Sequence, residues 1–264
     1  RRGERRELFE FVAGKRVEGG GGMFCGGDTS WWRVPKGAEV TAKMNSVLKN
    51  FDATKPSASV PALLDLRKTL RGLGDDPWIA QKRKDLDAII GACLGLHLEA
   101  IAAKPAAQPG DDLEIQIEAV NRSPVAVQLK SPAAKALLPN ELVAEKINVA
   151  VPKDQPFSEP YWLREPATVG TYAVADQTLI GRPENPPPFP VNVTVQVGGE
   201  EISYALEPRF RKVDRVAGET SEPLVIAPPA FVQLPQPVFV FGNDAAKTIT
   251  VRVIASAEKW SGQV

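Results

Sequence analysis

A chain of 264 residues is long enough for one large domain or two small ones, and we expect more than one module. Its 32 lysines and arginines balance its 32 aspartates and glutamates, so the formal net charge is zero. No overall field draws such a chain to nucleic acid or to an anionic membrane, and neither partner is expected. The longest apolar runs, such as residues 237–241, fall far short of the roughly 20 residues of a spanning helix, so no membrane span is expected.

Compartment cannot be read from the N-terminus of the chain. The sequence opens on Arg1-Arg2-Gly3-Glu4-Arg5-Arg6, without an initiator methionine or a hydrophobic signal region, which predicts a fragment or a processed product. Two cysteines, Cys25 and Cys93, are too few for a disulfide framework and do not have C-x-x-C spacing.

Residues 1–56 are predicted to be a connecting segment with one helix. The stretch from Gly19 to Gly27 is loop by composition, because ordering many glycines is entropically costly, and Glu7 to Ala13 could form a helix end. Apolar residues spaced by three and four predict a helix over 37–51 that packs through one face. That face consists of Val40, Met44, Val47, Leu48 and Phe51.

Residues 57–105 are predicted to be a helical hairpin. The first helix covers 57–73 and ends at Gly72 and Gly74. The second begins at Asp75-Asp76-Pro77, where a carboxylate caps the helix and proline takes its first position, and is predicted to run to about Ala103. A short glycine connection between amphipathic helices predicts an antiparallel pair. The apolar face of the first helix consists of Val60, Leu63, Leu64, Leu66 and Leu70. That of the second consists of Trp78, Ile79, Leu86, Ile89, Ile90, Cys93, Leu94, His97 and Ile101.

Residues 106–215 are predicted to be a β-sandwich, because the apolar period changes to two. Apolar and polar residues alternate from Leu113 to Ala119, which predicts a half-buried strand. They also alternate in the two runs that flank Gly198-Gly199, which predicts a β-hairpin with a glycine turn. Several strands without intervening helices favour an antiparallel immunoglobulin-like sandwich, and the fold class is α+β, mostly β. Further strands are expected at 125–129, at 147–151 and at about 172–174.

Residues 216–264 are predicted to be a proline-rich linker followed by the first strands of a further β module. Prolines punctuate the chain beyond Gly218, which is typical of an extended spacer. Alternation returns from Thr248 to Ile254, so the chain is expected to end inside that module.

The sequence contains few residues for catalysis. A catalytic zinc site needs about three protein ligands, and a Ser-His or Cys-His system needs an imidazole, but the chain has one histidine, His97. Cys93 and His97 are four residues apart and could touch across one helical turn, although a core cysteine beside an amphipathic histidine is the favoured interpretation. The glycine run has no phosphate-loop pattern, and the pairs Asp111-Asp112 and Glu200-Glu201 are best explained as solvated turn charges.

Aromatic residues in aperiodic sequence are the better candidates for function. Trp31 and Trp32 form one pair, and Tyr161 and Trp162 form another. Such residues either plug the edge of a core or offer a stacking surface for a sugar, and plugging is the favoured interpretation. The four residues are nevertheless the candidate glycan-stacking positions.

The block from Tyr-Trp-Leu-Arg at Tyr161 to Pro-Glu-Asn-Pro-Pro at Pro183 carries a specific pattern. It resembles the region downstream of the catalytic domain in large bacterial deacetylases of the LmbE-like, or PIG-L, family, and the resemblance spans most of the chain. Other matching stretches are Ser158 to Pro160, Glu165-Pro166, Val169 to Tyr172, Leu179 to Arg182, Gly27 to Trp31, Arg33 to Pro35, Phe51-Asp52 and Asp75 to Trp78. The region between Leu129 and Asn148 is shorter than the family pattern, which leaves its strand pairing open.

The resemblance implies a parent protein that removes acetyl groups from N-acetylglucosamine-containing glycans, with zinc held by an Ala-His-Pro-Asp-Asp-type loop and distant histidines. That loop is absent here, so no catalytic or metal residue carries over, and no cofactor is expected in this chain. The implied partner is the catalytic domain of the same polypeptide, and the implied location is periplasmic or extracellular. We expect an accessory region that positions the enzyme or contacts glycan; the alternatives are a carbohydrate-binding module and a structural or assembly module of a surface protein.

Overall fold

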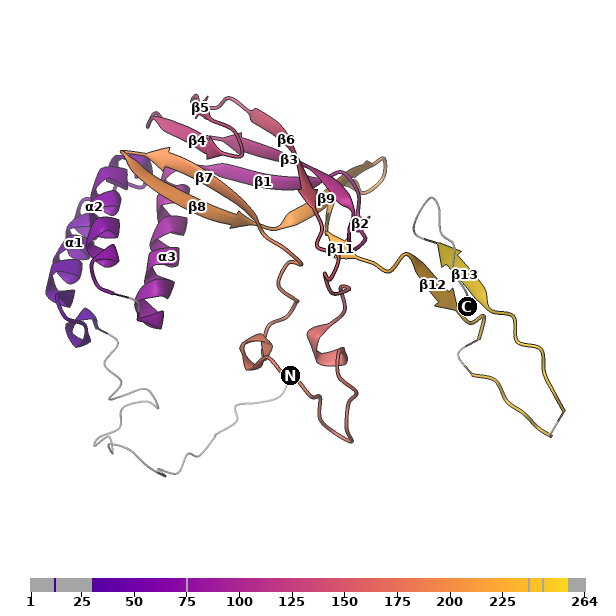
Figure 1. Cartoon of the computed structure of the whole chain (residues 1–264). Coiled ribbons are helices and arrows are strands. Elements are labelled where there is room, and N and C mark those ends of the chain that lie inside the picture. The colour runs from indigo at the N-terminus through magenta and orange to yellow at the C-terminus, as the bar shows by residue number, and fades with distance from the viewer. Residues whose placement is uncertain (1–11, 13–29, 75, 237, 244, 256–264) are drawn as a thin grey trace. The chain divides into compact units, whose positions relative to one another are not determined.

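The computed structural model describes residue 12 and residues 30–74, 76–236, 238–243 and 245–255 (Figure 1). The chain divides into two compact units, residues 1–87 and 88–264. Helices come first and strands follow, which confirms the predicted α+β, mostly β, class. Of residues 7–13 only Val12 is described, so the helix end expected there lies outside the described residues, as do the loop from Gly19 to Gly27 and Cys25.

The described residues contain three α-helices, and the boundary between the two units falls within the third. Lys36, at φ 63°, precedes the first helix, and Asp76 caps the third by accepting hydrogen bonds from the backbone N–H groups of Trp78 (2.8 Å) and Ile79 (3.3 Å). That cap is the one predicted from the Asp-Asp-Pro sequence. The helical elements are the 3₁₀ helix η1 Trp31–Arg33, α1 Gly37–Lys49, the 3₁₀ helix η2 Pro56–Ser59, α2 Val60–Arg71 and α3 Pro77–Leu94.

Helices α2 and α3 form the predicted antiparallel hairpin. Arg67 on α2 forms an ion pair with Asp87 on α3 at 2.6 Å, and Arg83 donates back to the carbonyl oxygen of Leu70 at 3.2 Å. The residue numbers of the partners rise on one helix as they fall on the other, as antiparallel neighbours require. All five residues of the predicted apolar face of α2 are buried.

Helix α1 forms as predicted, but its predicted buried face is wrong. Val40 is fully buried, whereas Met44 is 36% exposed, Leu48 70% and Phe51 49%. The spacing of apolar residues predicted the helix correctly. It did not show how few of these side chains are buried against the rest of the described unit.

The predicted end of α3 is also wrong. The helix ends at Leu94, and Gly95 follows in the left-handed conformation at φ 57°. The N–H of Leu96 donates to the carbonyl of Gly91 (2.9 Å) and that of Gly95 to Ala92 (3.0 Å), which is a Schellman termination.

The early end of α3 changes the predicted apolar face of this helix. His97 and Ile101, predicted on the helix, lie instead on the first strand of the second unit. Ile89, also predicted on the buried face, is 49% exposed. The face that is buried is correspondingly shorter and contains Ile79, Leu86, Ile90, Cys93 and Leu94.

The second unit contains a β-sandwich. Its larger sheet has the strand order β10-β9-β1-β3-β6 and its other main sheet the order β5-β4-β7-β8 (Figure 1). The strands are β1 His97–Ala102, β2 Ala106–Ala107, β3 Asp112–Val120, β4 Val127–Ser131, β5 Lys135–Leu137, β6 Val143–Ala150, β7 Val191–Val197, β8 Glu200–Leu206, β9 Pro208–Asp214, β10 Gly218–Pro223, β11 Val225–Ile226, β12 Ala230–Gln233 and β13 Arg252–Ala255.

The connectivity is that of an immunoglobulin-like sandwich. Strands β1, β3 and β6 pair antiparallel in one sheet, while the chain crosses to the other sheet for β4 and β5 and again for β7 and β8. This exchange between sheets is the Greek-key pattern of such sandwiches. The strand pairing between Leu129 and Asn148, left open by the sequence, is a β4–β5 hairpin followed by β6.

The core lies between the two sheets and comes from the alternation visible in the sequence. One face of β3 and one face of β7 are almost completely buried, and the residues between them are more exposed. The β7–β8 hairpin turns through Gly198 and Gly199, both at positive φ, as the predicted glycine turn requires. The buried apolar residues of these two strands are Leu113, Ile115, Ile117, Ala119, Val191, Val193, Val195 and Val197.

Two sequence predictions in this unit need correction, and one strand was missed. Residues 172–174 form no strand, and the segment that begins at Gly218 is not a linker throughout, because β10 pairs with β9 and β11 pairs with β2. Strand β9 was not predicted. It joins the larger sheet parallel to β1, where Arg211 reaches Glu99 (3.3 Å) and Glu118 (3.0 Å) across two neighbouring strands.

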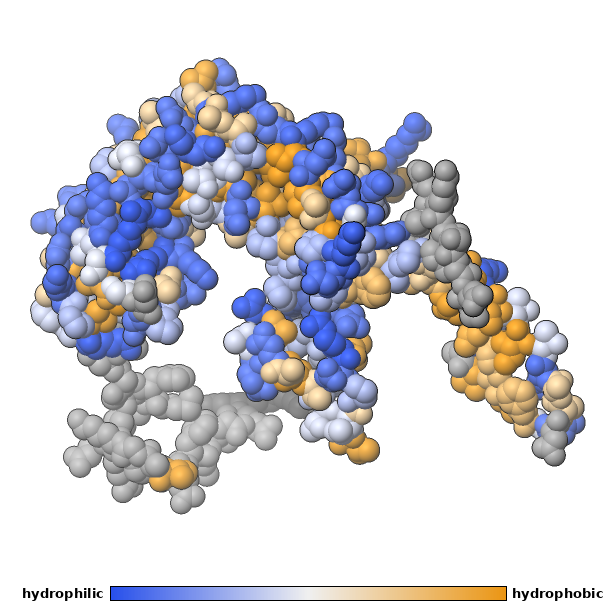
Figure 2. Space-filling view, in the orientation of Figure 1, coloured by the Kyte–Doolittle hydropathy of each residue, from blue (hydrophilic) through white to orange (hydrophobic). Residues whose placement is uncertain are grey.

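Strands β12 and β13 form a separate two-stranded antiparallel sheet. Figure 2 shows apolar side chains gathered over this segment. That these strands begin a further β module stays a prediction. The exposed apolar residues of the segment are Phe231, Val232, Leu234, Val238, Val240, Phe241, Ile249, Val251 and Ile254.

Candidate functional site

The connection between β6 and β7, residues 151–190, is the most unusual part of the sandwich. It is far longer than the roughly 12–15 residues above which an irregular loop is uncommon and usually functional. Its only regular elements in the described structure are the short 3₁₀ helices η3 Tyr161–Leu163 and η4 Gln177–Leu179. We call residues 151–190 the long loop.

Hydrogen bonds of Ser158 and Gln155 hold the start of the long loop in place. Ser158 and Ile226 on β11 exchange two of them, since the Ser158 N–H donates to the Ile226 carbonyl (2.8 Å) and the Ile226 N–H donates to the Ser158 Oγ (2.9 Å). Gln155 Nε2 donates to the carbonyl of Pro188 at 3.1 Å, which ties the beginning of the loop to its end. The loop therefore has fixed ends as well as a fixed attachment to β11.

Asn185 connects two segments of the long loop that are distant in sequence. Its Oδ1 accepts a hydrogen bond from the backbone N–H of Tyr161 at 2.9 Å, and its Nδ2 donates to the carbonyl of Glu159. The Tyr161 hydroxyl donates to the carbonyl of Arg182 at 3.1 Å. The Tyr-Trp-Leu-Arg and Pro-Glu-Asn-Pro-Pro sequences thus meet in space, and one amide side chain joins them.

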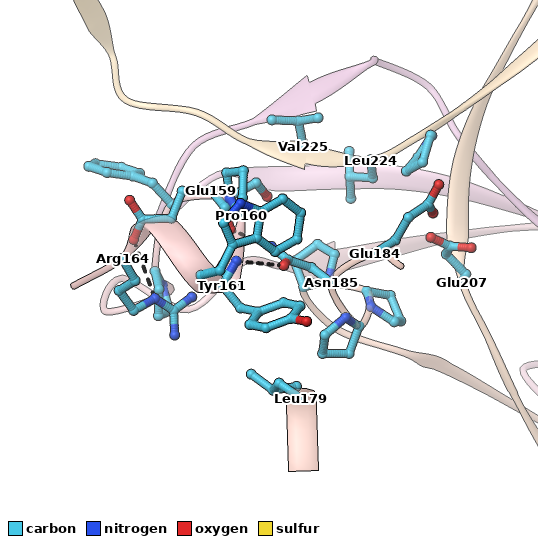
Figure 3. Close-up of a pocket in the computed structure, with 18 of the residues that line it drawn as sticks. Glu159, Pro160, Tyr161, Arg164, Leu179, Glu184, Asn185, Glu207, Leu224 and Val225 are labelled. Carbon is cyan, nitrogen blue, oxygen red and sulfur yellow. Dashed lines mark hydrogen bonds and ion pairs between the residues drawn. The ribbon is translucent and has the colours of Figure 1, made fainter. Parts of the chain in front are cut away.

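The two joined segments, with Glu207 and residues 223–225, enclose a cleft of 590 Å³ (Figure 3). Tyr161 and Trp162 contribute aromatic rings that meet edge to face, with centroids 4.9 Å apart and planes at 89°. Proline fixes φ, so the many prolines of the lining give it stiff walls. These prolines are Pro156, Pro160, Pro183, Pro186, Pro187, Pro188 and Pro223.

Carboxylates outnumber cationic groups in the lining of the cleft. Glu159 forms an ion pair with Arg164 at 3.3 Å, and Figure 3 shows this pair on one side of Tyr161 with Glu184 and Glu207 on the other. Glu207 has an ion pair with Arg209 at 3.2 Å, outside the lining. The fourth lining carboxylate, Asp176, caps η4, and hydrogen bonds from the Thr178 hydroxyl and N–H hold its pKa below the usual range.

The four predicted stacking residues lie in different environments. Trp31 is only 8% exposed, with its ring 4.3 Å from that of Trp78, and therefore has too little free surface for a sugar. It fills the plugging role that the sequence favoured. Trp32 is 71% exposed on η1. Tyr161 and Trp162 line the cleft.

Cys93 and His97 do not form the helical pair that their spacing allowed. Cys93 lies near the end of α3 and is buried, which raises the pKa of its thiol, whereas His97 is on β1 beyond the end of the helix. The His97 side chain is 41% exposed and its Nε2 lies 3.6 Å from Glu99 Oε2. Burial and a raised pKa both disfavour the reactive thiolate, which agrees with the core role favoured from the sequence.

The described residues do not fit a zinc site. Among them there is no group of three or more histidine, cysteine, aspartate or glutamate side chains that could hold a metal ion. Asp111 has a turn role, since its Oδ2 accepts a hydrogen bond from the Gln108 N–H at 2.9 Å. Asp112 begins β3, and Glu200 and Glu201 begin β8. In the described part of the chain, no helix has the length and apolarity that a bilayer span requires.

Four residues that shape or line the cleft were not singled out as site residues from the sequence. They are Ser158, Glu184, Asn185 and Glu207. A usable signal was present for Asn185, because an asparagine between glutamate and prolines in a long aperiodic stretch favours a fixed turn contact. No comparable local signal marks Glu207, since it directly follows β8 and joins the site only through the fold.

Comparison with known proteins gives no family. No protein-family model and no curated protein matches the chain. Among solved structures, the alkylpurine DNA glycosylase AlkC of Pseudomonas fluorescens, bound to DNA containing an abasic site analog, matches at 11% identity with a TM-score of 0.21. The match covers 66% of this chain and 48% of that one, so the chain spans about half the length of that protein. A similarity at this level identifies neither fold nor function.

Proposed function

We propose that this chain is a non-catalytic accessory region of a PIG-L/LmbE-like deacetylase and that its cleft holds part of an N-acetylglucosamine-containing glycan. The observation that carries the proposal is the 590 Å³ cleft itself, in which Asn185 joins Tyr161 to the proline-rich segment. The two sequence blocks that carry the family resemblance most specifically are the same two that build this cleft.

The chemistry of the lining suits a sugar. A pyranose ring has apolar faces and a polar rim, and Tyr161 and Trp162 offer aromatic surface while Glu159, Glu184 and Glu207 offer acceptors for hydroxyl groups. The volume of 590 Å³ falls within the roughly 300–1,000 Å³ of small-ligand sites.

Hydrolysis itself is assigned to the catalytic domain of the same polypeptide. A deacetylase zinc needs about three ligands and an open position, and the described residues supply no such group. A periplasmic or extracellular location belongs to this proposal as an implication of the family resemblance. In this proposal, the present chain binds and orients the glycan, and the catalytic domain hydrolyses its acetyl groups.

Calorimetric titration with the N-acetylglucosamine tetramer tests the cleft. We expect saturable binding that is lost in Trp162→Ala, because that substitution removes an aromatic wall of the cleft. The matched control is Trp32→Ala, which removes an equally large but exposed ring outside the cleft lining and should leave binding unchanged. Absence of heat at millimolar tetramer, or binding that depends on Trp32 instead of Trp162, would contradict the proposal.

An acetate-release assay tests the non-catalytic part of the proposal. With added zinc and N-acetylglucosamine oligomers, the chain should release no acetate. Turnover by the chain itself, removed by substitution of His97, would show that the reactive centre lies here.

A second candidate function, an assembly or surface-attachment module, is favoured by the apolar surface of β12 and β13. Phe231, Val232 and Ile254 are between 45% and 63% exposed on a sheet of only two strands, which is rarely stable alone in water. Light scattering over a range of concentrations separates the two functions, since a strict monomer at every concentration counts against assembly.

A further inference from the structure

We infer that the cleft prefers the deacetylated amino sugar, in which an ammonium group replaces the acetamide, over the N-acetylated form. This inference deepens the proposed function and depends on it. It rests on the charge distribution around the aromatic wall of the cleft, and it assigns the cleft to the product side of the reaction rather than to the substrate side.

The lining has an excess of negative charge. Glu159, Asp176, Glu184 and Glu207 face a single lining cation, Arg164, and no lysine lines the cleft. Arg164 is already within 3.3 Å of Glu159. A neutral acetamide has no net charge for the remaining carboxylates to stabilise, whereas an ammonium group in their vicinity is stabilised by charge attraction.

Glu184 is the carboxylate best placed for an incoming cation. Glu207 has Arg209 at 3.2 Å and Asp176 is engaged by Thr178, but Glu184 has no hydrogen bond or ion pair to any part of the chain that the structure describes. Figure 3 shows Glu184 and Glu207 on the same side of Tyr161. An amino sugar stacked near the aromatic pair would therefore find its charge complement at Glu184.

The rigid frame around Glu184 makes this preference specific to a ring rather than to any cation. Asn185, the next residue, is held by Tyr161 and Glu159, and prolines stand on both sides of the Glu-Asn pair. The backbone that carries the carboxylate is thus fixed relative to Tyr161. A flexible cationic chain would have to lose more conformational entropy than a sugar ring to meet the same geometry.

Parallel calorimetric titrations with the glucosamine tetramer and the N-acetylglucosamine tetramer, at low salt and at a pH where the amines are protonated, test the inference. We expect the glucosamine tetramer to bind about three- to tenfold more tightly, as one partly exposed ion pair allows. Glu184→Gln should abolish most of that difference while retaining binding. Glu141→Gln, the same change at an exposed carboxylate outside the cleft lining, should keep it.

The outcomes separate the inference from the proposed function. Equal affinities for the two tetramers, or tighter binding of the acetylated one, would overturn the inference and leave glycan binding standing. Failure of both tetramers to bind would overturn both. Binding of tetralysine as tightly as the glucosamine tetramer would also overturn the inference, because charge alone would then explain the preference.

Discussion

The β-sandwich and the long loop belong to the same unit but are stabilised by different interactions. In β3 and β7, alternate residues are buried against the facing sheet, and Ile117 and Val193 have no exposed surface. In residues 152–190 no side chain of the described structure is fully buried, and the segment is held by hydrogen bonds from Ser158, Gln155 and Asn185. Burial secures the scaffold, and a small number of directional bonds shape the cleft.

This difference separates stability from function. Loss of buried surface in the sandwich affects the whole unit, because core side chains are closely packed between the two sheets. Loss of one bond in the long loop changes the geometry of the cleft and little else. Substitutions in the two regions should therefore give opposite patterns of unfolding and binding.

Ile117→Ala should have the largest effect. Ile117 lies within β3 with 0% exposure, so the substitution removes buried apolar surface and leaves a cavity. We expect a loss of about 2–5 kcal/mol in the free energy of unfolding, measured by urea denaturation. Val213→Ala, at an 80% exposed position on β9, should change it by less than about 0.5 kcal/mol. Similar losses in the two variants would mean that burial does not secure the sandwich.

Gly95→Ala should have an intermediate effect, at the point where α3 gives way to β1. Gly95 has φ 57°, and a Cβ there would lie 3.0 Å from the Cβ of Arg122. We expect a loss of about 1–2 kcal/mol on thermal or chemical unfolding, since left-handed backbone is unfavourable for a residue with a side chain.

Gly72→Ala is the matched control for Gly95→Ala. Gly72 follows α2 with φ −76° in the right-handed region, and its added Cβ would lie 3.4 Å from the Thr69 carbonyl oxygen. The variant should be neutral or slightly more stable, because alanine restricts the unfolded chain. If both substitutions destabilised equally, the left-handed conformation would not be the cause.

The helix end at Gly95 shows why the sequence predicted some elements and not others. Apolar residues continue past it at helical spacing through His97 and Ile101, so periodicity alone extended the helix to Ala103. The glycine was the contrary signal, and it decides the structure because the Schellman bonds need a left-handed residue there. The core strands of the sandwich were predicted well, because the alternation of apolar and polar residues can be read within each strand's own sequence.

Strands β9 and β10 were missed because their stability is not local. The sequence of β9 is mostly charged, and Arg211 gains its partners Glu99 and Glu118, which are 112 and 93 positions away, only after β1 and β3 have paired. Strand β10 pairs with β9 alone and ends at Pro223 on the outer edge of the sheet. A proline is tolerated at such an edge but is typical of a linker in sequence.

The candidate site was only partly predictable for the same reason. Tyr161 and Trp162 were identifiable because aromatic residues in aperiodic sequence are unusual. Asn185 and Glu207 take their roles from contacts that the fold creates. The sequence left two roles open for Trp31, because an exposed and a plugging tryptophan have the same sequence context, and the structure buries it.

Asn185→Ala should have the smallest effect on stability and a large effect on the cleft. The substitution removes the hydrogen bonds that join Tyr161 and Glu159 to the proline-rich segment. These groups are partly exposed and water can replace the bonds, so we expect a loss of no more than about 1 kcal/mol in unfolding free energy. Amide hydrogen exchange should accelerate at Tyr161, and binding of the N-acetylglucosamine tetramer should weaken together with it.

Asn192→Ala makes the same chemical change on β7, where the side chain is exposed, and should alter neither exchange at Tyr161 nor binding. Exchange at Ile226, whose N–H is held by Ser158, reports the separate attachment of the long loop. If Asn185→Ala leaves Ile226 protected, the cleft opens locally while the loop stays attached. If Ile226 loses protection as well, the hydrogen bonds of the long loop form and break as one cooperative unit. The whole long loop, and not the cleft alone, would then open independently of the sandwich.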